Sequence, residues 1–201
     1  MRVIGITGGI GSGKSAVLDY MQEHMNAVVC QADLVAHRLQ QPGQVCYVEI
    51  IERFGQDILN DQGEIDRGKL GLVVFADQEK LRQLNEIVHP AVKKHIQELI
   101  ATEKSLGTKI FAVEAALLIE DHYETICDEF WYIYADESIR RERLKRSRGY
   151  TDEQIDAVFA SQASEETYKA HSRYVIDNSG DFAATCRQIR YLGEEDEDET
   201  M

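Results

Sequence analysis

Residues 8–15, with the sequence GGIGSGKS, contain the pattern G-x-x-x-x-G-K-[ST], which is typical of a loop that wraps around phosphate groups. The apolar run at residues 2–7 before it predicts a buried strand, and residues 15–21 after it predict the start of a helix. A strand, then the loop, then a helix is the setting in which this pattern binds phosphate. The chain is therefore predicted to bind a nucleoside triphosphate.

The glycines and the two polar residues that end the loop have separate physical roles. Glycine takes positive φ angles without steric cost, so successive N–H groups can turn toward a polyphosphate. The following helix adds its positive end, Lys14 adds a charge for the β- and γ-phosphates, and Ser15 adds a hydroxyl for Mg²⁺. A glycine-rich turn that binds nothing is the alternative, which the complete motif in this setting disfavours. The residues expected to contact ATP are Gly9, Gly11, Ser12, Gly13, Lys14, Ser15 and Ala16.

Further apolar runs alternate with helical segments and predict an α/β fold. The expected strands are residues 2–6, 27–30, 109–114, 129–134 and 173–177. Five such strands with crossover helices predict a parallel sheet between helical layers, the three-layer sandwich of P-loop NTPases. Because the carboxyl ends of parallel strands meet at one edge, the loop, Asp33 and Glu114 are expected to converge there.

The alternation stops between Asp33 and Lys109, where the sequence predicts an inserted helical subdomain. Residues 44–54 and 67–102 have apolar residues at helical spacing and no convincing strand between them. Such an insertion could hold a phosphate acceptor, or it could be purely structural, since apolar helical stripes usually pack in a core. The expected organisation is a core at 2–40 and 105–192, an insertion at 41–104, a helical lid at 137–162 and an acidic disordered tail at 193–201.

Asp33 is a second candidate site residue because it follows the strand after the phosphate loop. A carboxylate there could orient and deprotonate an attacking hydroxyl, or it could bind a water of Mg²⁺. It could also be the N-cap of a helix over residues 34–39, a position that aspartate favours.

A basic cluster follows the fourth expected strand, although the chain as a whole is acidic. Its members are Arg140, Arg141, Arg143, Lys145, Arg146 and Arg148. Arginines that close over a transferring phosphoryl group stabilise its charge and exclude water, so the cluster favours a lid. The alternative is a solvated helix whose arginines pair with acidic neighbours one turn away.

Composition excludes several classes of function. A formal net charge of −14 weighs against nucleic acid as the main partner, and removing the six acidic residues at 194–199 still leaves −8. No apolar run approaches the ~20 residues of a membrane span, and the first residues lack the pattern of a signal peptide. The four cysteines are widely separated, which argues against a metal site or a disulfide framework. We expect a cytoplasmic enzyme, monomeric or weakly self-associating, with no nucleic-acid or membrane partner.

The motifs taken together resemble the dephospho-coenzyme A kinase family over residues 2–192. The shared features are the phosphate loop, QAD at 31–33, residues 67–75, LN at 84–85 with VHP at 88–90, LLIE at 117–120, RL at 143–144, Gln162 and VIDN at 175–178. This resemblance implies ATP-dependent phosphorylation of the ribose 3′-hydroxyl of dephospho-coenzyme A. It also implies that Asp33 is the base, that Lys14 and Ser15 hold phosphate and Mg²⁺, and that Arg143 with a neighbour forms the lid. Arg67 and His89 would contact the acceptor, although a histidine before proline is equally compatible with a packed core position.

The chain departs from the family pattern at four places. Ala16 stands where a threonine is usual, and Gln31 replaces the first acid of a D-x-D pair. Glu114 is followed by two alanines instead of a proline turn, and its place in the Mg²⁺ shell stays open. The second lid arginine of the family aligns with Ser147, so Arg148 is predicted to take its place.

Three other functions remain open at this point. Another nucleotide or small-molecule kinase would share the loop and the lid but would need a different acceptor pocket. A GTP-dependent switch would need an [NT]-K-x-D segment to read guanine, and the sequence has none. A catalytically degraded ATP-binding protein is the third, suggested by Gln31 and Ala16.

Overall fold

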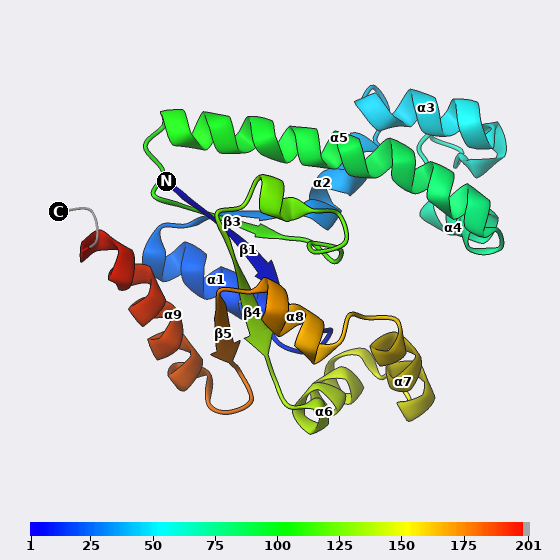
Figure 1. The fold of residues 1–201 in the computed structure, drawn as a ribbon. Helices are drawn as coiled ribbons and strands as arrows, with labels where there is room; N and C mark the ends of the chain where they lie inside the picture. The colour runs from blue at the N-terminus through cyan, green and yellow to red at the C-terminus, as the bar shows by residue number, and fades with distance from the viewer. Residues whose placement is uncertain (199–201) are drawn as a thin grey trace. The chain divides into compact units, whose positions relative to one another are not determined.

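A computed structural model describes the backbone of residues 1–198 and the side chains of residues 1–193 (Figure 1). The chain divides into two compact units, one made of residues 1–30 and 103 onward, the other of Gln31–Thr102. The second unit begins earlier than residue 41, where the inserted subdomain was expected, so Asp33 belongs to it.

The first unit is built on a five-stranded sheet with the strand order β2-β3-β1-β4-β5. The strands are β1 (Arg2–Thr7), β2 (Val28–Gln31), β3 (Ile110–Glu114), β4 (Glu129–Tyr134) and β5 (Tyr174–Asp177). The central strand β1 pairs in parallel with both β3 and β4, and β4 pairs in parallel with β5. The predicted α/β fold with five strands is confirmed, because apolar runs buried on both faces form the interior of such a sheet.

One face of the sheet is covered by α1 (Lys14–Met25) and α9 (Phe182–Asp198), which lie side by side (Figure 1). Alternate strand residues point into this layer, among them the fully buried Trp131. Together with side chains of the two helices they form one core of Ile4, Ile6, Val17, Leu18, Met21, Ala112, Trp131, Ile133, Ile176, Ile189 and Leu192. Removal of this apolar surface from water is the main source of stability for the first unit.

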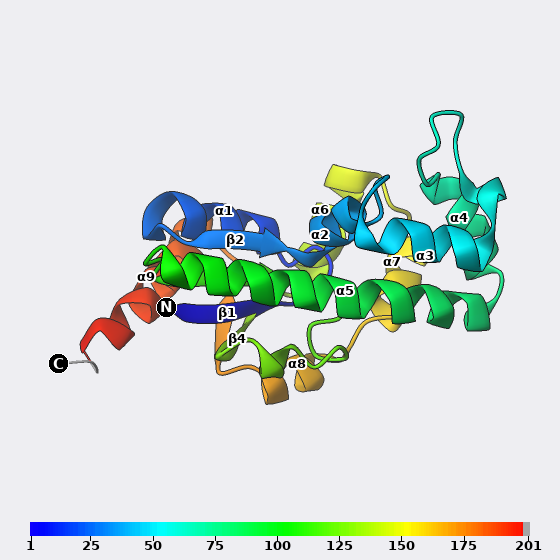
Figure 2. The ribbon, with the colours of Figure 1, turned by 90° about the horizontal axis from the view of Figure 1, so that it is seen from above.

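The opposite face of the sheet is covered by α8 (Glu165–His171) (Figure 2). Tyr168 of this helix stacks on Tyr132 of β4, with ring centroids 5.1 Å apart. Leu118, in the segment after β3, packs against Gly5 of β1. A Cβ added to Gly5 would lie only 2.9 Å from the Leu118 side chain. Helices on both faces make the first unit the predicted three-layer sandwich.

The predicted lid region contains two helices, α6 (Glu137–Arg148) and α7 (Asp152–Ala160). Arg141 of α6 forms ion pairs with Asp152 and Asp156 of α7, and Lys145 pairs with Asp152. These pairs are exposed, so each contributes little to stability, but together they join the two helices.

The expectation of a disordered tail from residue 193 is wrong for residues 193–198, which continue α9 as far as Asp198. Extending an existing helix needs no new nucleus, and glutamate has a good helix propensity. Residues 199–201, also assigned to that tail, lie outside the described part of the chain.

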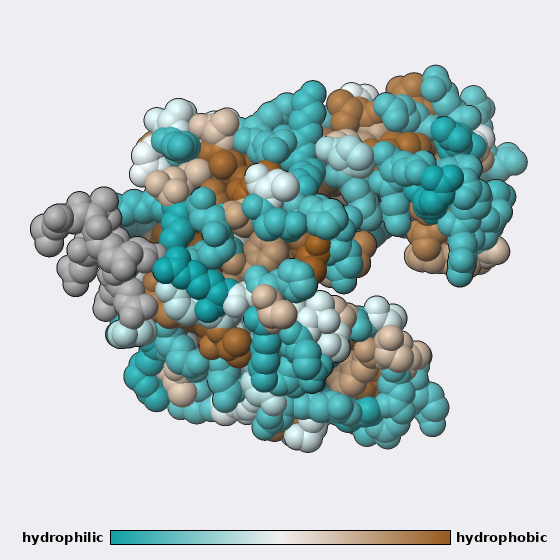
Figure 3. Space-filling model, viewed as in Figure 1, coloured by the Kyte–Doolittle hydropathy of each residue, from teal (hydrophilic) through white to brown (hydrophobic). Residues whose placement is uncertain are grey.

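The second unit is helical, as the sequence predicts for the insertion. Its helices are α2 (Ala32–Leu39), α3 (Val45–Phe54), α4 (Arg67–Phe75), α5 (Gln78–Ser105) and the short 3₁₀ turn η1 (Gln56–Ile58). The helical range expected at 67–102 is interrupted after Phe75, because the Asp77 carboxylate accepts the N–H of Glu79 and so caps the start of α5. Apolar residues remain exposed on α4, where Leu72 and Phe75 are each 80% accessible, and Figure 3 shows the mixture of apolar and polar surface.

A buried acid stands at the start of β4, at the end of the sheet away from the phosphate loop. The side chain of Glu129 is 2% exposed and pairs with Arg173 at 2.9 Å and Arg2 at 3.7 Å. Its Oε1 also accepts the indole N–H of Trp131 at 2.7 Å. Removing Glu129 takes a buried acceptor from the indole N–H of Trp131 and the paired carboxylate from Arg2, a loss that costs more than the network contributes.

Glu129→Ala should therefore lower the free energy of unfolding by about 3 kcal/mol, measured by urea denaturation. The matched control is Glu137→Ala, because Glu137 forms an exposed ion pair with Arg141. We expect the control to change stability by less than about 0.5 kcal/mol. Equal effects of the two substitutions would contradict a structural role for the buried acid.

Candidate phosphate-binding site

The loop between β1 and α1 has the backbone of a phosphate cradle. Gly11 and Gly13 have φ angles of 80° and 92°, values that residues with a side chain rarely adopt. Gly13 is the N-cap of α1, so the first N–H groups of that helix end at the loop. Unpaired N–H groups and the positive helix end favour an anion at this position.

Lys14, the first residue of α1, lies at the carboxyl edge of the sheet. Its ammonium donates to the Gly8 carbonyl at 2.7 Å and is 4.0 Å from Oε1 of Glu114. Glu114 is the last residue of β3 and lies opposite Ile6 of β1 in the sheet register. The expected convergence of the loop with Glu114 is therefore present in the structure.

Ser15 follows Lys14 in the first turn of α1 and is exposed. A hydroxyl and a carboxylate are oxygen ligands of the kind that Mg²⁺ prefers. Ser15 and Glu114 therefore carry suitable ligand atoms, and their metal role stays a prediction. Ser12, in contrast, is buried, and its hydroxyl has no hydrogen-bond partner among the described residues.

Arg140 of α6 packs directly against the loop. Its Nε donates to the Ile10 carbonyl at 2.9 Å, and its guanidinium lies 4.1 Å from the centre of the Phe159 ring. A Cβ at Gly9 would overlap this guanidinium, so glycine there permits the contact. Within residues 1–193 no carboxylate forms an ion pair with Arg140. The structure thus places a partly buried cation, free of an acidic partner, beside the loop.

Gln162 completes this side of the loop. Its Oε1 accepts the backbone N–H of Ile10 at 2.9 Å and an N–H of Arg140 at 3.2 Å. The amide thereby ties the segment after α7 both to the loop and to the arginine. From the sequence, Gln162 is indicated only by the family resemblance, which gives it no role.

Arg140 carries a positive charge beside the loop, next to two neutral phenols. Burial lowers the pKa of Arg140, yet an arginine remains protonated at neutral pH. Burial also raises the pKa of Tyr168, and burial together with Glu165 raises that of Tyr132 to about 12. Both phenols are uncharged at neutral pH, as tyrosines ordinarily are, and the nearby negative charges of Glu137 and Glu165 favour the protonated form of Arg140.

Arg143 reaches the loop from the same helix, three residues after Arg140. It donates to the carbonyls of Gly11 and Ser12 at 3.4 and 3.3 Å, and to that of Asn178 at 2.8 Å. Arg148, the last residue of α6, is exposed, and its side chain forms no hydrogen bond or ion pair with the described residues. Of the two arginines predicted for the lid, the structure brings one to the loop.

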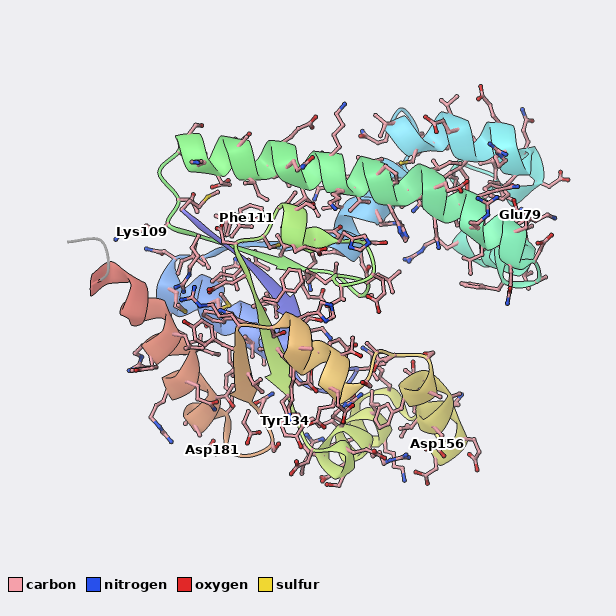
Figure 4. All side chains as sticks on the ribbon, in the orientation of Figure 1. Glu79, Lys109, Phe111, Tyr134, Asp156 and Asp181 are labelled. Atoms are coloured by element: carbon pink, nitrogen blue, oxygen red, sulfur yellow. The ribbon has the colours of Figure 1, made fainter. Side chains whose placement is uncertain are left out.

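The sequence signal for Arg140 was its spacing. Residues three apart share one face of a helix, so Arg140 and Arg143 face the same way, whereas Arg148, five residues after Arg143, is rotated by about 140° from it. In Figure 4, Tyr134 marks the end of β4, close to α6, and Asp181 lies in the turn that leads into α9.

The other predicted site residues, Asp33, Arg67 and His89, lie on three different helices of the second unit. Asp33 is exposed and is the second residue of α2, whose N-cap is Gln31. The alternative that Asp33 is the N-cap of a helix starting at residue 34 is therefore wrong, because that helix begins at Ala32. A carboxylate in the first turn still interacts favourably with the positive helix end.

Arg67 is the exposed first residue of α4, capped by the Asp66 carboxylate. His89 is half-buried within α5 and lines a surface groove of about 530 Å³. The groove is also lined by Gln78, Leu81, Arg82, Asn85, Glu86 and Pro90. A groove-lining position leaves His89 able to contact a ligand.

A parallel sheet in this strand order, with a glycine-rich loop and lysine after the central strand and arginines against the loop, defines a P-loop kinase, a class that uses ATP. A model of the family described as dephospho-CoA kinase matches residues 2–184. The chain belongs to the dephospho-CoA kinase family.

None of the helices in the described part of the chain is long and apolar enough to cross a membrane.

Relatives and solved structures agree with this membership. The dephospho-CoA kinase of Carboxydothermus hydrogenoformans is 39% identical over 94% of this chain and 91% of its own length. That of Thermobifida fusca is 40% identical over 90% of this chain and 88% of its own. The crystal structure of TT1252 from Thermus thermophilus matches with a TM-score of 0.81 and 27% identity, over 96% of this chain and 97% of the other. A shikimate kinase from Acinetobacter baumannii, at 14% identity and a TM-score of 0.52 over 96% and 90% of the two chains, shares the fold.

Proposed function

We propose that this chain transfers the γ-phosphoryl group of ATP to the ribose 3′-hydroxyl of dephospho-CoA, forming CoA and ADP. Family membership over residues 2–184 is the observation that carries the proposal. The phosphate cradle supports it, because the loop, Lys14 and Arg140 together supply the charge that phosphoryl transfer needs. This is the last step of coenzyme A biosynthesis.

The loop and Lys14 would hold the donor. Their N–H groups and ammonium would donate to the oxygens of the β- and γ-phosphates, where negative charge must be balanced as the phosphoryl group moves. Lys14 donates to the Gly8 carbonyl at 2.7 Å in this structure, a neutral acceptor that it can exchange for a phosphate oxygen. Ser15 and Glu114 would hold Mg²⁺, which when bound neutralises charge on the β- and γ-phosphates.

Arg140 would neutralise charge on the transferring group. It is anchored by Ile10 and Gln162 and has no carboxylate partner in the described chain, so its charge is available to a phosphate. A preorganised donor of this kind stabilises the transition state without reorganisation. Arg143 donates to two carbonyls of the loop and so stabilises its conformation. Arg148 stays a candidate lid residue.

Asp33 would accept the proton of the acceptor hydroxyl and orient it for attack. Arg67 and His89 would contact the acceptor from the second unit. The phosphoryl group then moves to the hydroxyl oxygen as its bond to the β-phosphate oxygen breaks, and ADP leaves.

The acceptor is tested by offering the purified protein ATP with dephospho-CoA or with a panel of nucleoside monophosphates, while ADP release is followed. We expect turnover with dephospho-CoA and only background with the monophosphates. The product should carry its new phosphate on the 3′-oxygen, which phosphorus NMR identifies. Turnover restricted to the monophosphates would reject the proposed acceptor and favour a different nucleotide kinase.

Arg140→Lys should lower kcat/KM for ATP about tenfold. Lysine keeps the charge but loses the planar fork that donates to Ile10 and Gln162 at the same time. Arg146→Lys is the matched control, since Arg146 is an exposed arginine of the same helix. A larger loss of kcat/KM for ATP in Arg148→Lys than in Arg140→Lys would assign the lid role to Arg148, as the sequence predicts.

A further inference from the structure

Asn178 connects the end of β5 to the phosphate loop. It is 3% exposed, and its Nδ2 donates to the Ser12 carbonyl at 2.7 Å. Its backbone N–H donates to the Tyr134 carbonyl at 2.8 Å, and its own carbonyl accepts from Arg143 at 2.8 Å. Asn178 is thus held by β4 and α6 while its side chain holds the loop.

Thr185, in the first turn of α9, sets the orientation of the Asn178 amide. The threonine is 1% exposed, and its hydroxyl lies 3.0 Å from Oδ1 of Asn178 and 3.0 Å from the Asp177 carbonyl. The backbone carbonyl of Ser12 can only accept a hydrogen bond, so the Asn178 group that faces it must be the NH₂. The Thr185 hydroxyl then donates toward two oxygens, Oδ1 of Asn178 and the Asp177 carbonyl. Both ends of the amide therefore have partners that define which way it points.

The carbonyl of Ser12 and the N–H of Gly13 belong to one planar trans peptide, so they point in opposite directions. Asn178 holds the carbonyl on its own side and thereby directs the Gly13 N–H away from itself. A Cβ on Gly13 would overlap Nδ2 of Asn178, so the glycine permits this close approach. Arg143 adds weaker bonds to the same carbonyl and to that of Gly11.

We propose that Asn178 is a positioning residue for the phosphate loop, and that Thr185 acts through it. The pair fixes the peptide between Ser12 and Gly13 before nucleotide binds. The conformational entropy of ordering the Gly13 N–H is therefore lost on folding and not on nucleotide binding. The inference rests on the nucleotide-binding part of the proposed function and does not depend on the identity of the acceptor. Positioning predicts an effect on ATP affinity and little effect on the acceptor.

The test compares Thr185→Val, which removes the hydroxyl but keeps the shape, with Thr185→Ser, which restores the hydroxyl. ATP dissociation constants are measured by titration calorimetry, and unfolding is measured on the same samples. We expect Thr185→Val to weaken ATP binding about tenfold and Thr185→Ser to stay within about twofold of the unaltered protein. The KM for dephospho-CoA should be unchanged in both.

A double-mutant cycle separates action through Asn178 from a general packing role. Asn178→Asp should weaken ATP binding by at least tenfold, because two acceptor oxygens then face each other at Ser12. Adding Thr185→Val to Asn178→Ala should cause no further loss. Fully additive losses, or a Thr185→Val protein that is less stable but binds ATP normally, would overturn the proposal. If Asn178 variants do not fold, the valine and serine pair at Thr185 still decides it.

Discussion

Asp33→Asn is expected to lower kcat about 10³-fold and to leave the ATP dissociation constant nearly unchanged. The substitution keeps the shape of the side chain and removes its ability to accept a proton from the attacking hydroxyl. Asp33 is exposed in the first turn of α2, so the amide can replace it without loss of a buried contact. Single-turnover rates with dephospho-CoA measure the effect on the chemical step directly.

The matched control is Asp57→Asn, an exposed carboxylate in η1 of the same unit. It should leave kcat unchanged, since it lies outside the proposed site. Near-normal turnover of Asp33→Asn would remove the base assignment. If the unaltered protein and Asp33→Asn both bind ATP and neither turns over, the chain is a catalytically degraded member of the family.

Lys14→Ala should lower turnover by about 10²-fold or more. The substitution removes the charge closest to the migrating phosphoryl group, an ammonium that lies 4.0 Å from the Glu114 carboxylate in this structure. Losing this cation disfavours negative charge at the loop, so ATP binding should weaken as well. Initial rates over a range of ATP concentrations separate the loss in kcat from the rise in KM.

Lys104→Ala is the control for this prediction, because Lys104 is an exposed lysine near the end of α5. Its rate should match that of the unaltered protein. An unchanged rate in Lys14→Ala would contradict the role of the loop as the phosphate site.

The strands and the phosphate loop were predictable because their signals are local. A short apolar run such as 129–134 predicts a buried strand by itself, and the structure places β4 at those residues. Similarly, glycines at positions 11 and 13 predict positive φ angles wherever the loop stands in a fold. Helix ends were predicted less well, because the Asp77 cap that interrupts residues 67–102 competes with a continuous apolar pattern.

The candidate site was predicted in part. Lys14 and Glu114 could be placed together, because neighbouring parallel strands end at the same edge of a sheet. Among the six clustered basic residues the family resemblance singled out Arg143 and Arg148 but not Arg140, because all six are cations on one short stretch of helix. Contacts of Arg140 with Ile10, and of Asn178 with Ser12, join residues more than a hundred positions apart.

The sequence by itself determined the fold class and the phosphate loop, because each depends on residue types at short, regular spacing, and it determined the family through motifs spread over residues 2–192. Only the tertiary structure decided which side chains surround that loop. It selected Arg140 beside Gly9 and the pair Asn178 and Thr185 behind Ser12. The physical reason is that a buried hydrogen bond forms only where packing brings donor and acceptor within about 3 Å, and packing is a property of the whole unit.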